Sequence, residues 1–338
     1  MTTAVATPST AHPHAKPPSP STRVKSIDVH PTKRWTLAAF YDGTVVVTDA
    51  ATQRRLHSIA VSPGSPVRSA RFLVSRDGGD ATMIAAASDD GHIRVVDLAS
   101  AAVVGSVHAH DDYVRALALH ATRPLALSCG DDKTVKLWDT SRPTWTCVAV
   151  FQGHDHYVMG VQWQPLTQPP SSANANTDSA TLAFASVSLD HCVRYWRTTD
   201  TGHVQDVRVV HAHDKGINAL AFDAAGRTLV TGADDYALKV WDTVDGSLRA
   251  ALIGHTGHVT AVAVHATLPL IASGAEDGTV RLWDAETLRC VAVAPTGDDV
   301  GRVWALAFAV ADEASRAVVV GYDAGDRVLP FDDKIARL

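Results

Sequence analysis

The sequence contains few of the features that mark a membrane-spanning or disulfide-stabilised protein. No stretch of the 338 residues approaches the run of about 18 consecutive apolar residues that a transmembrane helix needs. The hydrophobic fraction of 46% is nevertheless ample for the core of a globular protein. Cysteine is scarce and has no paired spacing, so we expect no disulfide framework and a reduced, cytosolic setting. The cysteines are Cys129, Cys147, Cys192 and Cys290.

The sequence also lacks the short motifs of catalytic and metal sites. There is no Gly-x-Ser-x-Gly nucleophile turn and no phosphate-binding glycine loop. The seventeen histidines form no His-Glu-x-x-His motif, and there is no Cys-x-x-Cys, so a zinc site has no support. We therefore expect a non-enzymatic protein without a cofactor, although an enzyme with an unrecognised nucleophile or metal remains an alternative. The net charge of −6 argues against general nucleic-acid affinity and is compatible with a basic partner.

One cassette, an acidic turn followed by a short strand that carries a large aromatic residue, recurs along the chain. It reads DDKTVKLWD at 131–139, DDYALKVWD at 234–242 and EDGTVRLWD at 276–284, with weaker copies at 89–97 and 189–197. Successive copies are 42, 58, 45 and 42 positions apart, measured between their last residues. Such a period predicts one four-stranded blade of a β-propeller per repeat.

The rest of each repeat supports this interpretation. An apolar run, expected to form the innermost strand of a blade, precedes each cassette. These runs cover 67–72, 114–119, 158–163, 217–222 and 259–264. Weaker units at 24–49 and 303–332 raise the count to seven blades. We therefore predict an all-β, seven-bladed propeller over 23–338, a disordered Pro/Ser/Thr-rich tail over 1–22, and a low-complexity loop at about 166–181 within blade four.

The repeated residues resemble those of WD-repeat propellers, in which His, Asp, Ser or Thr, and Trp form a hydrogen-bonded set within one blade. By this resemblance, blade three uses His110, Asp132, Ser128 and Trp138. A buried imidazole needs a carboxylate partner and a buried indole N–H needs an acceptor, so a structural role is chemically reasonable. Because such histidines recur once per blade, we interpret them as structural and not as metal ligands or proton relays.

Charged residues recur where each blade meets the funnel at one face of the ring, which is the default binding site of a propeller. One group is basic: Arg23, Lys25, Arg68, Arg115 and Arg302. The other group is acidic or polar: Tyr41, Asp89, Asp112, Asp131, Asp234 and Glu276. These groups predict adjacent positive and negative pockets in blades one to three. The alternative is that the charges only solvate the loop tips, as most surface charges do.

Segments outside the cassettes carry a more specific resemblance. RVKSIDVHP at 23–31, PVRSARF at 66–72, AHDDYVR at 109–115 and GHDHYVM at 153–159 are similar to the family of coatomer (COPI) beta-prime subunits. SLDHCVRYW at 188–196, GAEDGTV at 274–280, RVW at 302–304 and GYD at 321–323 continue the similarity into the last blade, so that it spans about 23–323, in order and in every blade. The propeller of that family binds C-terminal dilysine signals, KKxx and KxKxx, on membrane proteins returned from the Golgi to the endoplasmic reticulum.

The resemblance implies a role for each matching residue. Arg23, Lys25 and Arg68 match the clamp for the terminal carboxylate. Asp112 and Asp131 match the acceptors of the lysine three residues before the terminus. The remaining matches are further lining positions or candidates for a second lysine: Tyr41, Asp89, Arg115, Asp234, Glu276 and Arg302. The chemistry agrees, because a clamp of cations selects a free carboxylate and an ammonium suits two carboxylates.

The family also implies partners and a location. If the chain is part of a longer protein, the implied partners are the alpha and epsilon coatomer subunits. The implied location is the cytoplasm, peripherally on the Golgi membrane, which the protein reaches only through the coat. The family also implies binding of ubiquitin, although no residue here decides it. The family continues into a second propeller and a helical solenoid, whereas this sequence stops at Leu338. The alternative function is a generic WD-repeat scaffold, such as a ubiquitin-ligase substrate receptor or peptide reader.

A further departure lies before Arg23, where the family has a strand that closes the last blade. The proline-rich stretch found here cannot donate regularly to a ladder. We expect residues 334–338 or a weak edge to close blade seven, and the seam between blades seven and one to be the least stable part.

Overall fold

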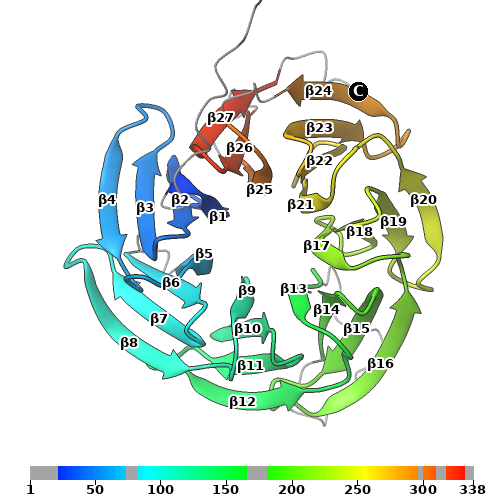
Figure 1. Cartoon of the computed structure of the whole chain (residues 1–338). Helices are drawn as coiled ribbons and strands as arrows, with labels where there is room; N and C mark the ends of the chain where they lie inside the picture. The colour runs from blue at the N-terminus through cyan, green and yellow to red at the C-terminus, as the bar shows by residue number, and fades with distance from the viewer. Residues whose placement is uncertain (1–21, 74–81, 166–180, 296–299, 310–316, 332–338) are drawn as a thin grey trace, which may run out of the picture.

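The structure is a computed structural model, and it describes residues 22–73, 82–165, 181–295, 300–309 and 317–331. These residues form seven antiparallel sheets arranged around a common axis like the blades of a propeller (Figure 1). Six sheets have four strands, and the last has three within the described part of the chain. The predicted all-β, seven-bladed propeller is therefore confirmed.

Each blade runs outward from the axis in chain order, so that its first strand is the innermost (Figure 1). Blades one to three contain β1 (Val24–Val29), β2 (Trp35–Phe40), β3 (Thr44–Asp49), β4 (Arg55–Ala60); β5 (Val67–Leu73), β6 (Met83–Ser88), β7 (His92–Asp97), β8 (Ala102–His108); and β9 (Val114–Leu119), β10 (Leu125–Gly130), β11 (Val135–Asp139), β12 (Thr146–Phe151). Blades four and five contain β13 (Val158–Trp163), β14 (Leu182–Ser188), β15 (Cys192–Thr198), β16 (Val204–His211); and β17 (Ile217–Phe222), β18 (Thr228–Ala233), β19 (Leu238–Asp242), β20 (Leu248–Leu252). Blades six and seven contain β21 (Val259–Val264), β22 (Leu270–Ala275), β23 (Thr279–Asp284), β24 (Cys290–Pro295); and β25 (Val303–Phe308), β26 (Ala317–Tyr322), β27 (Gly325–Pro330).

The first residue of every innermost strand anchors that strand in the core between blades. All seven are β-branched and 0% exposed: Val24, Val67, Val114, Val158, Ile217, Val259 and Val303. β-branched side chains suit such buried strands because they pack well on a pleated surface. Since successive side chains of a strand point to opposite sides, the residues flanking each anchor are directed away from this core.

The histidines predicted to be structural lie in hydrogen-bonded sets, each within one blade, in blades three to six. In blade three the indole N–H of Trp138 donates to Ser128 Oγ at 2.8 Å, and Ser128 Oγ lies 2.7 Å from His110 Nε2. The other ring nitrogen of His110 lies 2.8 Å from Asp132. Although burial opposes it, the hydrogen bond from His110 lowers the pKa of Asp132 to about 2. Equivalent sets occur in blades four to six, at His154–Ser186–Trp196–Asp190, His213–Thr231–Trp241–Asp235 and His255–Ser273–Trp283–Asp277.

Blade two replaces this set with an ion pair. Arg94 Nη2 lies 2.5 Å from Asp90 Oδ2, and Ser88 Oγ donates to the same carboxylate at 2.6 Å. The hydrogen bonds from Arg94 and Ser88 lower the pKa of Asp90 well below its usual range, although burial opposes them. The weaker cassette at 89–97 therefore keeps the acidic turn and exchanges imidazole and indole for guanidinium.

The seam between blades seven and one contains a continuous apolar cluster that includes Val24 and Phe40 from blade one and Val319 from blade seven. Its predicted low stability remains a prediction. The tail predicted over 1–22 and the loop predicted over about 166–181 lie outside the described residues, apart from Thr22 and Thr181. The closing segment predicted at 334–338 also lies outside them.

Candidate functional site

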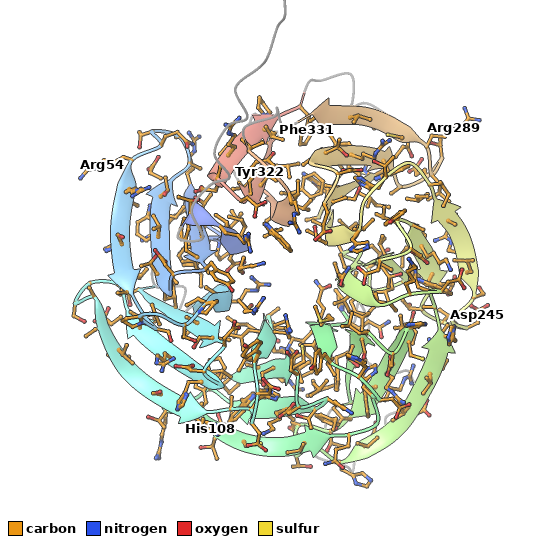
Figure 2. All side chains as sticks on the ribbon, viewed as in Figure 1. Arg54, His108, Asp245, Arg289, Tyr322 and Phe331 are labelled. Carbon is orange, nitrogen blue, oxygen red and sulfur yellow. The ribbon has the colours of Figure 1, made fainter. Side chains whose placement is uncertain are left out.

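A β-bulge follows the anchor residue in every blade, between the first and third residues of the innermost strand. A bulge leaves one residue without a partner in the ladder and re-aims its side chain. We call these seven the bulge residues: Lys25, Arg68, Arg115, Met159, Asn218, Thr260 and Trp304. Side chains surround the central axis of the ring on all sides (Figure 2). The repeat therefore places one bulge residue on the innermost strand of each blade.

A second set of seven residues lies next to the bulge residues. Each is the first residue of the turn after the second strand of its blade: Tyr41, Asp89, Asp131, Leu189, Asp234, Glu276 and Asp323. In every blade the backbone N–H of this turn residue donates to the carbonyl of the residue that precedes the anchor, at 2.9–3.3 Å. These preceding residues, which we call entry residues, are Arg23, Pro66, Tyr113, Tyr157, Gly216, His258 and Arg302.

In blades two and three the bulge and turn residues form ion pairs. Arg68 donates to both oxygens of Asp89, at 2.5 and 2.8 Å. Arg115 donates to both oxygens of Asp131, each at 2.6 Å. The side chains are largely buried, with Asp131 only 4% exposed. The predicted positive and negative groups are therefore paired with each other within a blade and do not form separate pockets.

In blade seven the bulge residue is an uncharged donor to the turn carboxylate, and an ion pair across the seam joins the same carboxylate to blade one. Trp304 donates its indole N–H to Asp323 Oδ1 at 2.7 Å, and Arg23 Nε donates to the same oxygen at 2.7 Å. The backbone N–H of Arg302 donates to the other oxygen at 3.1 Å. Burial opposes ionisation, but the Trp304 and Arg302 hydrogen bonds and the Arg23 charge hold the pKa of Asp323 below its usual value.

Lys25 differs from the other cations of the funnel because its blade has no acid at the turn position. The turn residue of blade one is Tyr41, and among the described residues no ion pair to Lys25 is present. Its ammonium instead lies 3.4 Å from the centroid of the Trp304 ring. Burial, and then the charges of Arg68 and Arg23, lower the pKa of Lys25 from 10.5 to about 7. An anion bound here would relieve this repulsion and restore the charge.

An exposed rim borders the ion pairs of blades two and three. Tyr113 is 40% exposed, and its ring lies 5.4 and 5.6 Å from the guanidinium carbons of Arg68 and Arg115. Asp112 is exposed and accepts the backbone N–H of Tyr113 at 2.8 Å. Asp131 keeps free lone pairs despite its two bonds from Arg115, because each carboxylate oxygen can accept twice. A ligand ammonium can thus approach Asp112 from solvent, whereas the Asp131 side chain is only 4% exposed and is held by Arg115.

The opposite side of the funnel is acidic and more exposed. Asp234 accepts the side-chain amide of Asn218 at 2.7 Å, and Glu276 lies 3.2 Å from Arg302. His258 Nδ1 lies between the two carboxylates, 3.5 Å from Asp234 and 3.3 Å from Glu276. The exposed fractions of the two carboxylates are 30% and 26%, far above that of Asp131.

The predicted residues thus fall into three groups. Arg23 and Lys25 lie against the rings of Tyr41 and Trp304. Arg68 and Arg115 are paired with Asp89 and Asp131, next to Asp112. Asp234 and Glu276 flank His258, and Arg302 is paired with Glu276. Four residues of the site were not predicted from the sequence: Trp304, Asp323, Tyr113 and His258. Each is an entry, bulge or turn residue, so aligning the seven repeats position by position would have identified them.

Neither a metal-binding group of side chains nor a membrane-spanning helix is found among the described residues. Within those ranges no three His, Cys, Asp or Glu side chains are grouped so as to hold a metal ion. The same ranges contain no helix long and apolar enough to cross a membrane.

The WD domain, G-beta repeat family matches residues 102–139, 145–197, 204–242 and 246–284. Together with the seven blades, this match shows that the chain belongs to the WD-repeat family.

Within that family the chain is similar to coatomer beta′ subunits. It is 39% identical to coatomer subunit beta′-1 of Arabidopsis thaliana over 317 residues, which are 93% of this chain and 31% of that protein. It is 34% identical to coatomer subunit beta′ of Homo sapiens over 311 residues, which are 91% of this chain and 31% of that protein. The chain therefore spans about a third of the length of these relatives, and the predicted resemblance to the coatomer beta-prime propeller is confirmed.

Proposed function

We propose that the propeller is the cargo-binding part of a COPI vesicle coat subunit, and that its funnel binds C-terminal dilysine signals. The ligands are KKxx and KxKxx tails of membrane proteins carried from the Golgi to the endoplasmic reticulum and within the Golgi. The protein would then act in the cytoplasm, peripherally on the Golgi membrane and on coated vesicles. It would contact the membrane only through the coat and its cargo, and act as a binding protein without catalysis.

The observation that carries the proposal is the charge balance around the axis. Arg23, Arg68, Arg115 and Arg302 each have a carboxylate partner among the turn residues. Lys25 has none among the described residues, and it lies close enough to Arg23 and Arg68 for their charges to lower its pKa. A group of cations that is short of one anion suits a ligand that ends in a free carboxylate.

The lysines of the tail find acceptors in two places. Asp112 is exposed, and Asp131 lies beside it on the neighbouring turn with lone pairs to spare. The acidic side at Asp234 and Glu276 offers a second place for a basic side chain. Each partly desolvated ion pair of this kind contributes roughly 1–3 kcal/mol. Because the flexible tail loses entropy on binding, single sites stay weak and a polymerised coat gains avidity from many of them.

The proposal is tested with an N-acetylated fluorescent peptide that ends in Lys-Lys-x-x and the same peptide with an amidated C-terminus. We expect the free acid to bind at least about 30-fold more tightly, the equivalent of roughly 2 kcal/mol for lost charge-assisted hydrogen bonds. Lys25→Met should weaken binding of the free-acid peptide, because it removes the positive charge. The substitution keeps a side chain in contact with Trp304, so the loss reports on the charge alone. Asp131→Ala should weaken both peptides.

Arg249→Ala is the matched control, because Arg249 is an exposed arginine on β20, the outermost strand of its blade. It should leave both affinities unchanged. Equal binding of the two peptides would remove the carboxylate clamp. Binding of neither would favour a WD-repeat adaptor with another partner.

Coat assembly partners follow from the same proposal. If the chain is part of a longer subunit, the partners are the alpha and epsilon coatomer subunits. Ubiquitin is a further candidate ligand, and no contact among the described residues selects it.

A further inference from the structure

His258 lies in a part of the funnel that is short of one positive charge. Its neighbours are two carboxylates, Asp234 and Glu276, and one guanidinium, that of Arg302. Arg302 reaches only Glu276, at Oε1, while His258 faces the other oxygen of Glu276 and Oδ1 of Asp234. Charge neutrality in this group therefore requires one more cation beside Asp234.

The remaining neighbours of His258 do not provide that cation. Tyr236 stacks on the imidazole, with ring centroids 5.5 Å apart and an interplanar angle of 26°. Lys215 lies 5.8 Å from the Tyr236 ring centroid on the exposed side, and within the described chain no ion pair joins it to either carboxylate. Asn218 donates to Asp234 but carries no charge. Among the described residues, a protonated His258 is the group placed to complete the set; otherwise a cation of the ligand does so.

We propose that His258 is a specificity-determining residue of the funnel. When protonated, its imidazolium occupies the place of the second basic side chain of a bound tail, between Asp234 and Glu276. When neutral, it leaves that place to an ammonium of the ligand. The inference rests on the proposed function, since it assigns a subsite to the same peptide.

The geometry fits a replaceable counter-ion more closely than a structural one. The side chain of His258 is 40% exposed, whereas the four histidines of the WD-repeat sets are at most 1% exposed. Its contacts to the carboxylates are 3.3 and 3.5 Å long, and those of the structural histidines are 2.7–2.9 Å. Histidine is the side chain whose charge ordinarily changes between about pH 5 and 8, so the exchange can be tested by varying the pH.

The consequence is a selectivity that depends on pH. At high pH a dibasic tail gains an ion pair that a monobasic tail lacks. At low pH the imidazolium already neutralises the carboxylates, so the second lysine gains little. The ratio of the two dissociation constants, monobasic over dibasic, should rise from about 1 at pH 5.5 to roughly fivefold at pH 7.5. Lys25 cancels in this ratio, because both tails end in the same carboxylate.

Two substitutions fix His258 in either state. His258→Asn is uncharged at every pH, so the ratio should stay near fivefold at both pH 5.5 and 7.5. His258→Lys is charged at every pH, so the ratio should stay near 1. His156→Asn is the matched control, because His156 is exposed on the same face and contacts Tyr157 without a carboxylate partner in the described chain. It should behave as the unaltered protein.

The measurement is fluorescence anisotropy with monobasic and dibasic peptides at both pH values, after thermal melting has confirmed that each variant folds. A ratio that changes with pH in His258→Asn as it does in the unaltered protein would overturn the assignment. Failure of the carboxylate clamp gives a different result. Free and amidated peptides then bind with equal affinity, while the ratio of the monobasic and dibasic dissociation constants still reports on His258.

Discussion

The lowered pKa of Lys25 predicts that affinity for a carboxylate-terminated tail falls as the pH rises above 7. In the free protein, burial and the neighbouring guanidinium groups lower the pKa of Lys25 to about 7. A bound carboxylate offsets this repulsion and moves the pKa back toward 10.5. Binding is then coupled to uptake of a proton, so the affinity is fully present below pH 7 and is lost above it.

The size of the effect follows from the same shift. Between the pKa values of the free and bound states, each pH unit costs up to tenfold in affinity, or about 1.4 kcal/mol. We expect a loss of roughly fivefold between pH 7 and pH 8, because about half of the Lys25 side chains are already neutral at pH 7, and a loss approaching tenfold between pH 8 and pH 9. The loss levels off at the affinity of Lys25→Met, which should show no such dependence on pH in this range.

The assay is anisotropy with an N-acetylated peptide, so that no peptide amine titrates between pH 7 and 9. Lys215→Met, a substitution of an exposed lysine in blade five, should keep the full pH dependence. An unaltered protein whose affinity is constant from pH 7 to 9 would refute the reasoning. So would a Lys25→Met variant with the same slope as the unaltered protein.

The remaining predictions concern stability. Ser128→Ala should lower the free energy of unfolding by about 2–4 kcal/mol, because it leaves the buried indole N–H of Trp138 without an acceptor. Urea denaturation measures this change. Ser141→Ala, at an exposed position, is the control and should have no effect. Lys25→Met should raise the melting temperature by a few degrees at pH 7, since it removes a buried charge from beside two guanidinium groups; an unchanged melting temperature contradicts this. Stability should fall as the pH drops from about 4 toward 2, because three carboxylates whose pKa is lowered to about 2 then become protonated: Asp132, Asp190 and Asp277. Urea midpoints at several pH values measure this loss. A smaller loss should begin below pH 6.5, because burial lowers the pKa of two imidazoles that the unfolded chain protonates more readily, those of His213 and His255.

The fold was predictable because its information is local and repeated. The period of the cassette determines the number of blades, and the apolar runs identify the innermost strands; the run predicted over 67–72, for example, forms β5, which extends to Leu73. The hydrogen-bonded set of blade three was predictable for the same reason, since His110, Ser128 and Trp138 recur in order. Blade two was less readable, because Arg94 and Asp90 replace that set with an ion pair.

The charges of the funnel were predictable, but their pairing was not. Arg68 and Asp89 are 21 positions apart and meet only because a bulge re-aims one and a turn presents the other. The isolation of Lys25 depends on Tyr41 standing where five of the other six blades have an acid, which is visible only when the repeats are superposed. The position of His258 between two blades depends on tertiary geometry that no local pattern specifies.

Our central proposal is that Lys25 binds the terminal carboxylate of the tail. A double-mutant cycle tests this most directly. The cycle combines Lys25→Met in the protein with amidation in the peptide, and all four affinities are measured at pH 6.5. If the two groups interact, amidation costs much less in Lys25→Met than in the unaltered protein, with a coupling of about 1–2 kcal/mol. Additive losses, with amidation equally costly in both proteins, would contradict the account.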